Sequence, residues 1–210
     1  MTIDRFAPDN LGLRAQMLGA ANGLRFSAVT FLREQGVPAR WLAEACAAGE
    51  IGRAMVSYSR DRDHFELAEG AGEIAIILPV VEEGIVTDLV AFDPRQPDGW
   101  ALRCGNGVML GWDLWSANAW MPPRATGWAE APALKLYANP LQWVRGGGDG
   151  LCLLAWTPAT MAMLRALGPN RMIVCEDERF AAVVEEKMAE RQGLPAVRVM
   201  MPEMVLEAAE

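Results

Sequence analysis

The last third of the chain alternates short apolar runs with segments that carry helix-start signals, and this alternation constrains the fold most strongly. The apolar runs predict strands at 134–138, 151–156, 171–175 and 196–200. Helices are predicted between them, at 140–145, 158–167 and 178–192. Asn139-Pro140 and Thr157-Pro158 each place an N-cap residue before a proline at the first helical position. The resulting βαβαβαβ order predicts a parallel, Rossmann-like α/β sheet covered by helices.

Residues 1–120 follow a different pattern, with helical spacing first and strand spacing afterwards. Helices are predicted at 10–24, 27–35 and 38–48, the second capped by Ser27 and the third opening with Pro38. Strands are predicted at 53–59, 65–68, 73–81, 85–92, 100–104 and 108–111. Gly105-Asn106-Gly107 is typical of a tight hairpin, because glycine and asparagine tolerate positive φ. This part is therefore expected to be α+β, with helices followed by an antiparallel meander.

A stretch rich in proline, glycine and alanine separates the two parts. Residues 121–133 read MPPRATGWAEAPA, a composition typical of a linker. A short helix is predicted just before it, at 112–120. The expected domains are therefore 1–120, which holds the helical lead-in and the meander, and 134–210, which holds the α/β sheet.

The charge balance narrows the range of partners. The 210 residues carry 27 acidic and 19 basic side chains, a formal net charge of −8, and the only lysines are Lys135 and Lys187. Non-specific nucleic-acid binding needs Lys and Arg to neutralise phosphates, so this balance disfavours nucleic acid unless the fold assembles an arginine patch. No apolar run is long enough to span a membrane, and the first ten residues lack a signal-peptide pattern. A soluble, cytoplasmic protein with no membrane partner is expected.

Histidine and cysteine usage excludes several kinds of metal site. His64 is the only histidine, which excludes multi-histidine zinc and iron sites, and its RDRDH context is typical of a solvated turn. The four cysteines, at positions 46, 104, 152 and 175, form no C-x-x-C pair. Cys152 and Cys175 lie in apolar runs, where cysteine behaves as a small buried hydrophobe. A nucleophilic pair of a cysteine with His64 stays open, but no local pattern marks a stabilised thiolate.

Tryptophans gather around the boundary between the two parts. Five of the eight lie within residues 100–128: Trp100, Trp112, Trp115, Trp120 and Trp128. This cluster is typical of a packed junction between domains, and it also suits a surface for a protein partner or a second copy of the chain. Few basic residues interleave with these rings, which disfavours stacking on nucleic-acid bases.

The element order and four stretches resemble the Toprim module of bacterial and phage primases and topoisomerases. The stretches, within about residues 28–202, are the helical FLREQGVPARWLAEAC, the meander AIILPVVEEGIVTDLVAF, the acidic strand end MIVCEDERFAAVV and the closing AVRVMMPE. In that family, clustered carboxylates at the strand ends hold Mg²⁺ for phosphoryl transfer. The resemblance thus implies Glu176, Asp177 and Glu178 as candidate metal ligands and Mg²⁺ as the candidate cofactor.

Two positions depart from the family's pattern. Asn139-Pro140 stands where the family has Glu-Gly, and Cys175 stands where it has the first acid of Asp-x-Asp. Losing two of three acids removes most of the metal ligands. The resemblance therefore implies a degenerate, non-enzymatic Toprim-like protein that acts in binding or assembly, in a replication or prophage context.

Other functions stay open at this point. The acids at 176–178 can hold Mg²⁺ in a metal-dependent phosphotransferase or nuclease, with Asp113 or Asp149 joining them in space. The Trp-rich segment 100–128 can bind a protein partner or form a homo-oligomer. A purely structural role also fits the three acids, because acids between a strand and a helix cap the helix N-terminus.

Overall fold

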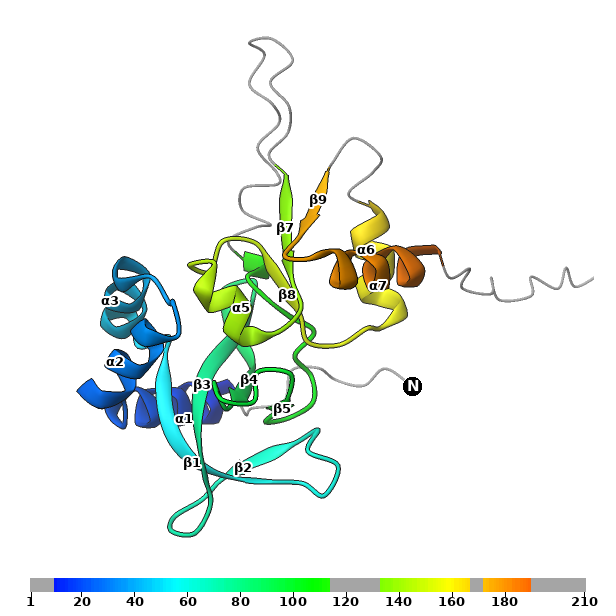
Figure 1. Ribbon diagram of the computed structural model, residues 1–210. Helices are drawn as coiled ribbons and strands as arrows, with labels where there is room; N and C mark the ends of the chain where they lie inside the picture. The colour runs from blue at the N-terminus through cyan, green and yellow to red at the C-terminus, as the bar shows by residue number, and fades with distance from the viewer. Residues whose placement is uncertain (1–9, 114–132, 167–171, 190–210) are drawn as a thin grey trace, which may run out of the picture.

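The computed structural model describes residues 10–113, 133–166 and 172–189, which form an α+β fold with two sheets (Figure 1). The helices are α1 (Asn10–Asn22), α2 (Phe26–Glu34), α3 (Ala39–Ala48), α5 (Pro140–Arg145), α6 (Pro158–Ala166) and α7 (Glu178–Ala189). The strands are β1 (Gly52–Tyr58), β2 (Phe65–Leu67), β3 (Glu73–Glu82), β4 (Ile85–Phe92), β5 (Trp100–Leu102), β6 (Met109–Leu110), β7 (Leu134–Tyr137), β8 (Leu151–Leu153) and β9 (Ile173–Cys175). Most of these elements were predicted from the sequence to within two residues.

The first sheet is antiparallel, with the strand order β2-β1-β3-β4-β5. Other elements cover the central part of both of its faces, and successive side chains of a strand point to opposite faces. Ile77 of β3 packs with Leu13 and Met17 of α1 on one face. Leu78 packs on the other face, in a cluster that also contains Leu42 of α3 and residues of the second sheet.

The second sheet has the order β6-β8-β7-β9, with β7 parallel to both β8 and β9 and with β6 antiparallel to β8. The parallel arrangement predicted for this part is confirmed for β7, β8 and β9. The predicted caps form as well: Gln142 N–H donates to Asn139 Oδ1 (2.9 Å), and Thr160 N–H donates to Thr157 Oγ1 (3.1 Å). α5 lies on the face toward the first sheet, whereas α6 and α7 cover the opposite face (Figure 1).

The hairpin predicted across Gly105-Asn106-Gly107 is wrong. β5 pairs with β4, and β6 pairs with β8, so the segment between them crosses from the first sheet to the second. A two-residue type I′ turn needs positive φ at two successive residues, and in this segment only Gly105 has it (φ 75°). Side-chain hydrogen bonds from β4 hold the segment in its crossing path instead.

Two other sequence-based predictions also need correction. β2 pairs with β1 on the side away from β3, so the first sheet is not a meander in sequence order. α2 begins at Phe26 with Arg25 as its N-cap residue, so Ser27 lies inside the helix and does not cap it.

Several predicted segments lie outside the described residues. They are the linker 121–133 apart from residue 133, most of the helix at 112–120, and the strand at 196–200. Among the helices that are described, none combines the length and the apolar character that crossing a membrane requires.

Candidate functional site at the carboxyl edge of the second sheet

The carboxyl ends of β7, β8 and β9 meet at one edge of the second sheet, because these strands run parallel. Asn139 follows β7, Leu154 follows β8 and Glu176 follows β9. Segment 98–107, which contains β5 and the loops on either side of it, approaches this edge, with Asp98 Oδ1 3.5 Å from Asn139 Nδ2. Open α/β sheets bind ligands outside the carboxyl ends of their strands, so this edge is the candidate site.

Glu176 joins the ends of β9 and β7. Its Oε1 accepts a hydrogen bond from the N–H of Ala138 (3.2 Å). The chain leaves β7 toward α5 on one face of the sheet and leaves β9 toward α7 on the other face. Glu176 therefore lies where the connections that follow β7 and β9 turn to opposite faces of the sheet, and its Oε1 holds the backbone N–H of Ala138 there.

Asp177 caps α7. Its Oδ1 accepts a hydrogen bond from the N–H of Phe180 (2.7 Å), three residues further along the chain. Glu178 is the first residue of α7 and is exposed to solvent. This is the structural role that acids between a strand and a helix can take, and it fixes the start of α7.

The environment of Glu176 favours its protonated form. Partial burial raises the pKa of its carboxyl, and the nearby carboxylates of Asp177 and Asp98 raise it further. The hydrogen bond from Ala138 and the positive charge of Arg145 act in the opposite direction. The net result is that the pKa of Glu176 is raised above its ordinary value.

The three acids do not meet the other carboxylates that the sequence offered as partners. Asp149 Oδ2 pairs with Lys135 Nζ (2.6 Å), and Asp113 Oδ2 accepts the N–H of Gly84 (2.6 Å). Within residues 10–113, 133–166 and 172–189, no three His, Cys, Asp or Glu side chains are grouped so that they could hold a metal ion. The Mg²⁺ site at Glu176, Asp177 and Glu178 stays a prediction.

The cysteines of the second sheet do not have the properties of nucleophiles. Cys152 is fully buried, and burial raises the pKa of its thiol far above its usual range, with the charge of Glu176 adding to the effect. Burial also raises the pKa of the Cys175 thiol, which is half-buried. Both thiols therefore remain protonated near neutral pH, as expected for structural cysteines.

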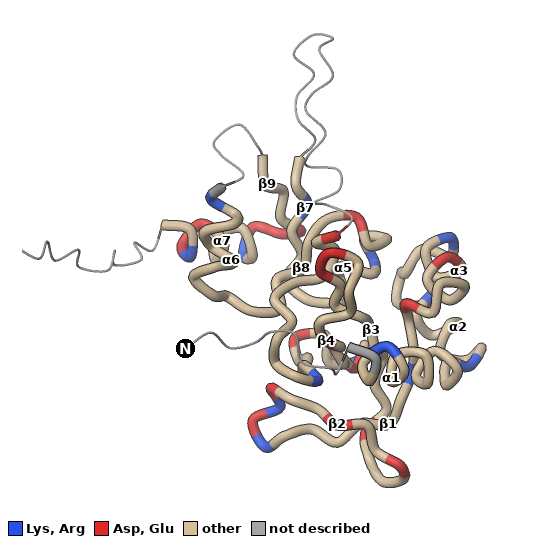
Figure 2. The backbone as a smooth tube through the Cα atoms, turned by 180° about the vertical axis from the view of Figure 1, so that it is seen from behind, with Lys and Arg blue, Asp and Glu red and all other residues tan. Residues whose placement is uncertain are grey.

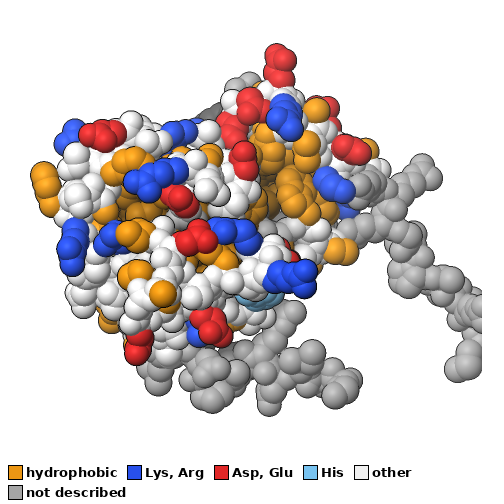
Figure 3. Space-filling view, turned by 60° about the horizontal axis from the view of Figure 1, so that its bottom comes forward, with side chains coloured by type: hydrophobic (Ala, Val, Ile, Leu, Met, Phe, Trp, Pro, Cys, Tyr) orange, Lys and Arg blue, Asp and Glu red, His pale blue; other side chains and the backbone are white. Residues whose placement is uncertain are grey.

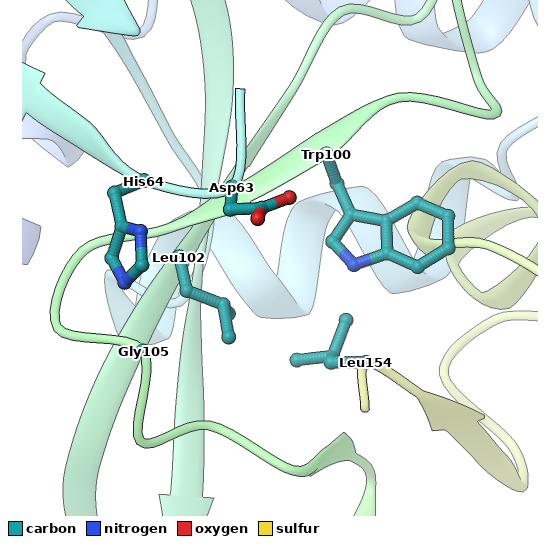
Figure 4. Close-up of a pocket in the computed structure, with 6 residues that line it drawn as sticks. All are labelled: Asp63, His64, Trp100, Leu102, Gly105 and Leu154. Atoms are coloured by element: carbon teal, nitrogen blue, oxygen red, sulfur yellow. The ribbon is translucent and has the colours of Figure 1, made fainter. Parts of the chain in front are cut away.

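A cavity of about 220 Å³ lies where segment 98–107 meets the end of β8 (Figure 4). It is lined by Asp63, His64, Trp100, Leu102, Gly105 and Leu154. The Asp63 carboxylate points toward the Trp100 ring, whereas the His64 ring points toward the Gly105 loop (Figure 4). The cavity thus has a carboxylate and an indole at one end and leucine side chains along its wall.

The turn that carries Asp63 and His64 is held by hydrogen bonds on both sides. Within the turn, Ser59 Oγ accepts the N–H of His64 (3.0 Å) and donates to Asp61 Oδ1 (2.6 Å). On the side of β5, the N–H of Leu102 donates to the carbonyl of Asp63 (2.9 Å). The alternating charges of this turn lie at the tip of the β1–β2 hairpin (Figure 2). These bonds position Asp63 at the cavity.

Asp88 of β4 holds the loop that carries the cavity residue Gly105. Its side chain is fully buried, and its Oδ1 accepts the N–H of Cys104 (2.8 Å) and that of Leu89 (2.8 Å). Its Oδ2 accepts the N–H groups of Asn106 (2.7 Å) and Gly107 (2.8 Å). Four backbone donors satisfy this buried carboxylate, and no ion pair to it is found in residues 10–113, 133–166 and 172–189. Asp88 therefore fixes the loop that follows β5.

Sequence reasoning missed Asp88. The signal was present, because Asp88 is the only charged residue in IVTDLVAF, a strand that otherwise has apolar residues and one threonine. A charged residue in such a strand is expected to be either at a surface or fully hydrogen-bonded. Only the fold shows which of the two applies and which amides it binds.

Gly105 and His64 are in close contact. A Cβ atom at Gly105 would lie 2.6 Å from His64 Nε2, and Gly105 has a positive φ of 75°. The positive φ favours glycine at this position, and any larger residue would also displace the tip of the His64 ring. His64 is exposed at the surface, as predicted for a turn histidine, and its ring is visible in the space-filling view (Figure 3). It also lines the cavity, which the sequence did not indicate.

The tryptophans of segment 100–128 have different roles where they are described. Trp100 lines the cavity and also packs against the core cluster that contains Leu78 and Leu42. Trp112 packs against the core cluster between the second sheet and the helices α6 and α7, which contains Met161 and Phe180. These contacts fit the packed junction that the sequence predicted. Trp115, Trp120 and Trp128 lie outside the described residues.

Comparison with known proteins yields no relative. No protein-family model matches the chain, and neither a curated protein nor a solved structure matches it significantly.

Proposed function

We propose that this chain is a non-enzymatic binding protein whose ligand site lies at the carboxyl edge of the second sheet. The observation that carries the proposal is the cavity beside Leu154, with walls held by hydrogen bonds that the Asp88 carboxylate and the Asp63 carbonyl accept. A pocket that is already formed binds without paying the free energy of ordering its walls.

The use of the nearby acids supports a binding role over a catalytic one. Glu176 holds the N–H of Ala138 and Asp177 holds the N–H of Phe180, so each has one oxygen committed to the backbone. A two-metal phosphoryl-transfer site needs carboxylates that face a common centre. Asn139, at the position of the Toprim family's glutamate, caps α5.

The relation to the Toprim module belongs to the same proposal. The parallel strands β7, β8 and β9 and the helices between them match the order that suggested the resemblance. A degenerate module of this kind would retain the sheet as a scaffold and use its carboxyl edge for binding or assembly. A replication or prophage context is the setting that the resemblance implies.

The test is a calorimetric titration of the full chain with Mn²⁺ and with Mg²⁺. Wild type, Asp177→Asn and Glu178→Gln should all show no saturable heat, because the carboxylates act as caps. Saturable binding in wild type that is lost in Asp177→Asn would contradict the proposal. Glu178→Gln is the matched control, since it removes an equal charge at the next position, and asparagine at position 177 can still accept the N–H of Phe180.

The alternative is a metal-dependent phosphotransferase or nuclease, and one observation favours it. The raised pKa of Glu176 is a property of residues that act in acid–base steps. This alternative predicts Mg²⁺-dependent cleavage or phosphoryl transfer on nucleic-acid substrates, and predicts that Glu176→Gln abolishes it. Absence of activity at every metal concentration, with intact folding, would leave the binding role.

A further inference from the structure

We propose that the cavity between segment 98–107 and β8 binds an alkylguanidinium or alkylammonium group, with Asp63 as the anionic contact and Trp100 as the aromatic one. The proposal deepens the binding role given above and rests on it. It stands on four features of the cavity: an unpaired carboxylate, an indole, two leucine side chains and walls that are already fixed.

The Asp63 carboxylate is available for a ligand. Within the part of the chain that the structure describes, no hydrogen bond or ion pair reaches its side chain. The arginine next to it in sequence is held elsewhere: Arg62 makes a two-point contact with Glu73 (3.1 and 3.0 Å) and stacks 4.1 Å from the centre of the Tyr58 ring. An ionised carboxylate only accepts hydrogen bonds, so its ligand must donate.

The Trp100 ring favours a cation over a neutral donor. The Asp63 carboxylate points toward this ring and both residues line the cavity (Figure 4), so a cation bound by Asp63 would lie next to the indole. An indole face attracts a cation within about 6 Å of its centre, and hydrogen bonds to a charged group are stronger than neutral ones. Guanidinium and ammonium groups satisfy both contacts.

The remaining wall fits an aliphatic stem. Leu102 and Leu154 line the cavity and their side chains are directed into it (Figure 4). A chain of a few methylene groups would bury apolar surface against them. The volume of about 220 Å³ suits a group of the size of an arginine or lysine side chain and is below the usual range for drug-sized ligands.

The same chemistry has two sources. One is a free small molecule, such as an alkylguanidine or a polyamine end. The other is the arginine or lysine side chain of a protein partner, which fits the net charge of −8 of this chain through electrostatic attraction. Both sources present the same group to Asp63 and Trp100.

The experiment follows the backbone amide and indole NMR signals of the full chain during titration with three probes of similar shape. The probes are butylguanidinium, its neutral analogue butylurea and the anion pentanoate. We expect butylguanidinium to bind with a dissociation constant of about 1 mM, as is ordinary for so small a ligand, and to shift the signals of Trp100 and Gly105. Asp63→Asn should weaken binding about tenfold or more, because it removes a charge-assisted hydrogen bond.

Matched variants separate the site from general charge effects. Glu66→Gln removes an equal charge from β2, at an exposed position outside the cavity, and should leave binding unchanged. Trp100→Phe retains a ring and should weaken binding only severalfold, whereas Trp100→Leu should weaken it as much as Asp63→Asn does. Equal binding to wild type and Asp63→Asn, or shifts confined to other surfaces, would overturn the proposal.

The probes also distinguish this proposal from the one on which it rests. If butylurea or pentanoate shifts Trp100 and Gly105 and butylguanidinium does not, the cation specificity is wrong and the binding pocket stands. If none of the three binds, the cation proposal is wrong, and the titration with Mn²⁺ and Mg²⁺ decides between the binding role and the metal-dependent alternative. A capped arginine and a short arginine-containing peptide identify the source: tighter binding of the peptide indicates a protein partner, and equal binding indicates a small ligand.

Discussion

Asp88 and the pair Glu176–Asp177 both use carboxylate oxygens to hold backbone amides, but in different surroundings. Asp88 is fully buried in β4 and accepts four N–H groups. Glu176 and Asp177 lie at an exposed strand end, and the described contacts give each one backbone N–H. The acids Glu176 and Asp177 lie where open α/β sheets bind ligands, but the buried Asp88 is the acid that holds the loop beside the cavity.

The difference has an energetic basis. Replacing a buried carboxylate leaves its backbone N–H donors without an acceptor in a protein interior that water does not reach. Losing a cap at an exposed helix start exposes amides that water can still reach. Asp88 should therefore dominate the stability of the cavity wall, and the edge acids should contribute less.

The largest effect is expected for Asp88→Asn. The amide nitrogen of the new side chain would face donors at Asn106 and Gly107, so the free energy of unfolding should fall by about 3 kcal/mol. Chemical denaturation measures this. The control is Asp149→Asn, whose carboxylate is in an exposed pair with Lys135 and should contribute less than about 0.5 kcal/mol. Similar losses in the two variants would contradict the contrast.

The next effect is expected for Gly105→Ala. The positive φ costs about 1 kcal/mol, and displacing the exposed tip of the His64 ring adds a smaller amount, for a total of about 1.5 kcal/mol. Gly84→Ala is the matched control, because Gly84 has almost the same φ (76°) but no atom within 4 Å of its Cβ position. It should lose only about 1 kcal/mol. Adding His64→Ala to Gly105→Ala should recover the steric part, and no recovery would refute the contact.

Asp177→Ala should have a smaller effect. Loss of the hydrogen bond to the N–H of Phe180 should lower the free energy of unfolding by about 1 kcal/mol, the usual contribution of an N-cap residue. Glu178→Ala, which removes only a charge in the first turn of α7, should cost a few tenths of that, about 0.3 kcal/mol. If Asp177→Ala were neutral, the capping role would be wrong.

The smallest effect is a pH dependence at Glu176. Its pKa is raised in the folded protein above the ordinary value of 4.5, so just above that value the folded state binds more protons than the unfolded state. Its contribution to stability is present below pH 4.5 and is lost as the pH rises through the raised pKa. The Tm of wild type should therefore fall relative to that of Glu176→Gln as the pH rises above 4.5.

A second variant sharpens that measurement. Asp98→Asn removes a carboxylate that raises the pKa of Glu176, so it should reduce the pH-dependent difference between wild type and Glu176→Gln. A difference that is constant with pH, or one that grows in favour of wild type as the pH rises, would contradict the raised pKa.

Local sequence signals predicted most of the fold. Asn139-Pro140 and Thr157-Pro158 start α5 and α6 as expected, because a cap acts within three residues of itself. The apolar runs at 73–81 and 85–92 likewise predicted β3 and β4, which pair with each other. Signals of this short range do not depend on the rest of the chain.

Pairing between distant segments could not be predicted in the same way. The hairpin at Asn106 failed because Asp88, far from it along the chain, binds its amide and that of Gly107. The cavity was not predicted because Asp63, Trp100 and Leu154 come from three separate segments. For the acids at 176–178, a metal site and a helix cap require the same residues, so the pattern alone did not decide between them.

Amide hydrogen exchange is the most direct test of the central claim, that the cavity wall is held in place by Asp88 while the edge acids act as local caps. The account predicts that the amides of Asn106 and Gly107, although they lie in a loop, exchange about as slowly as the core strands. The amides of Ala138 and Phe180 should exchange faster, through local opening. Equally fast exchange at all four amides would contradict the account.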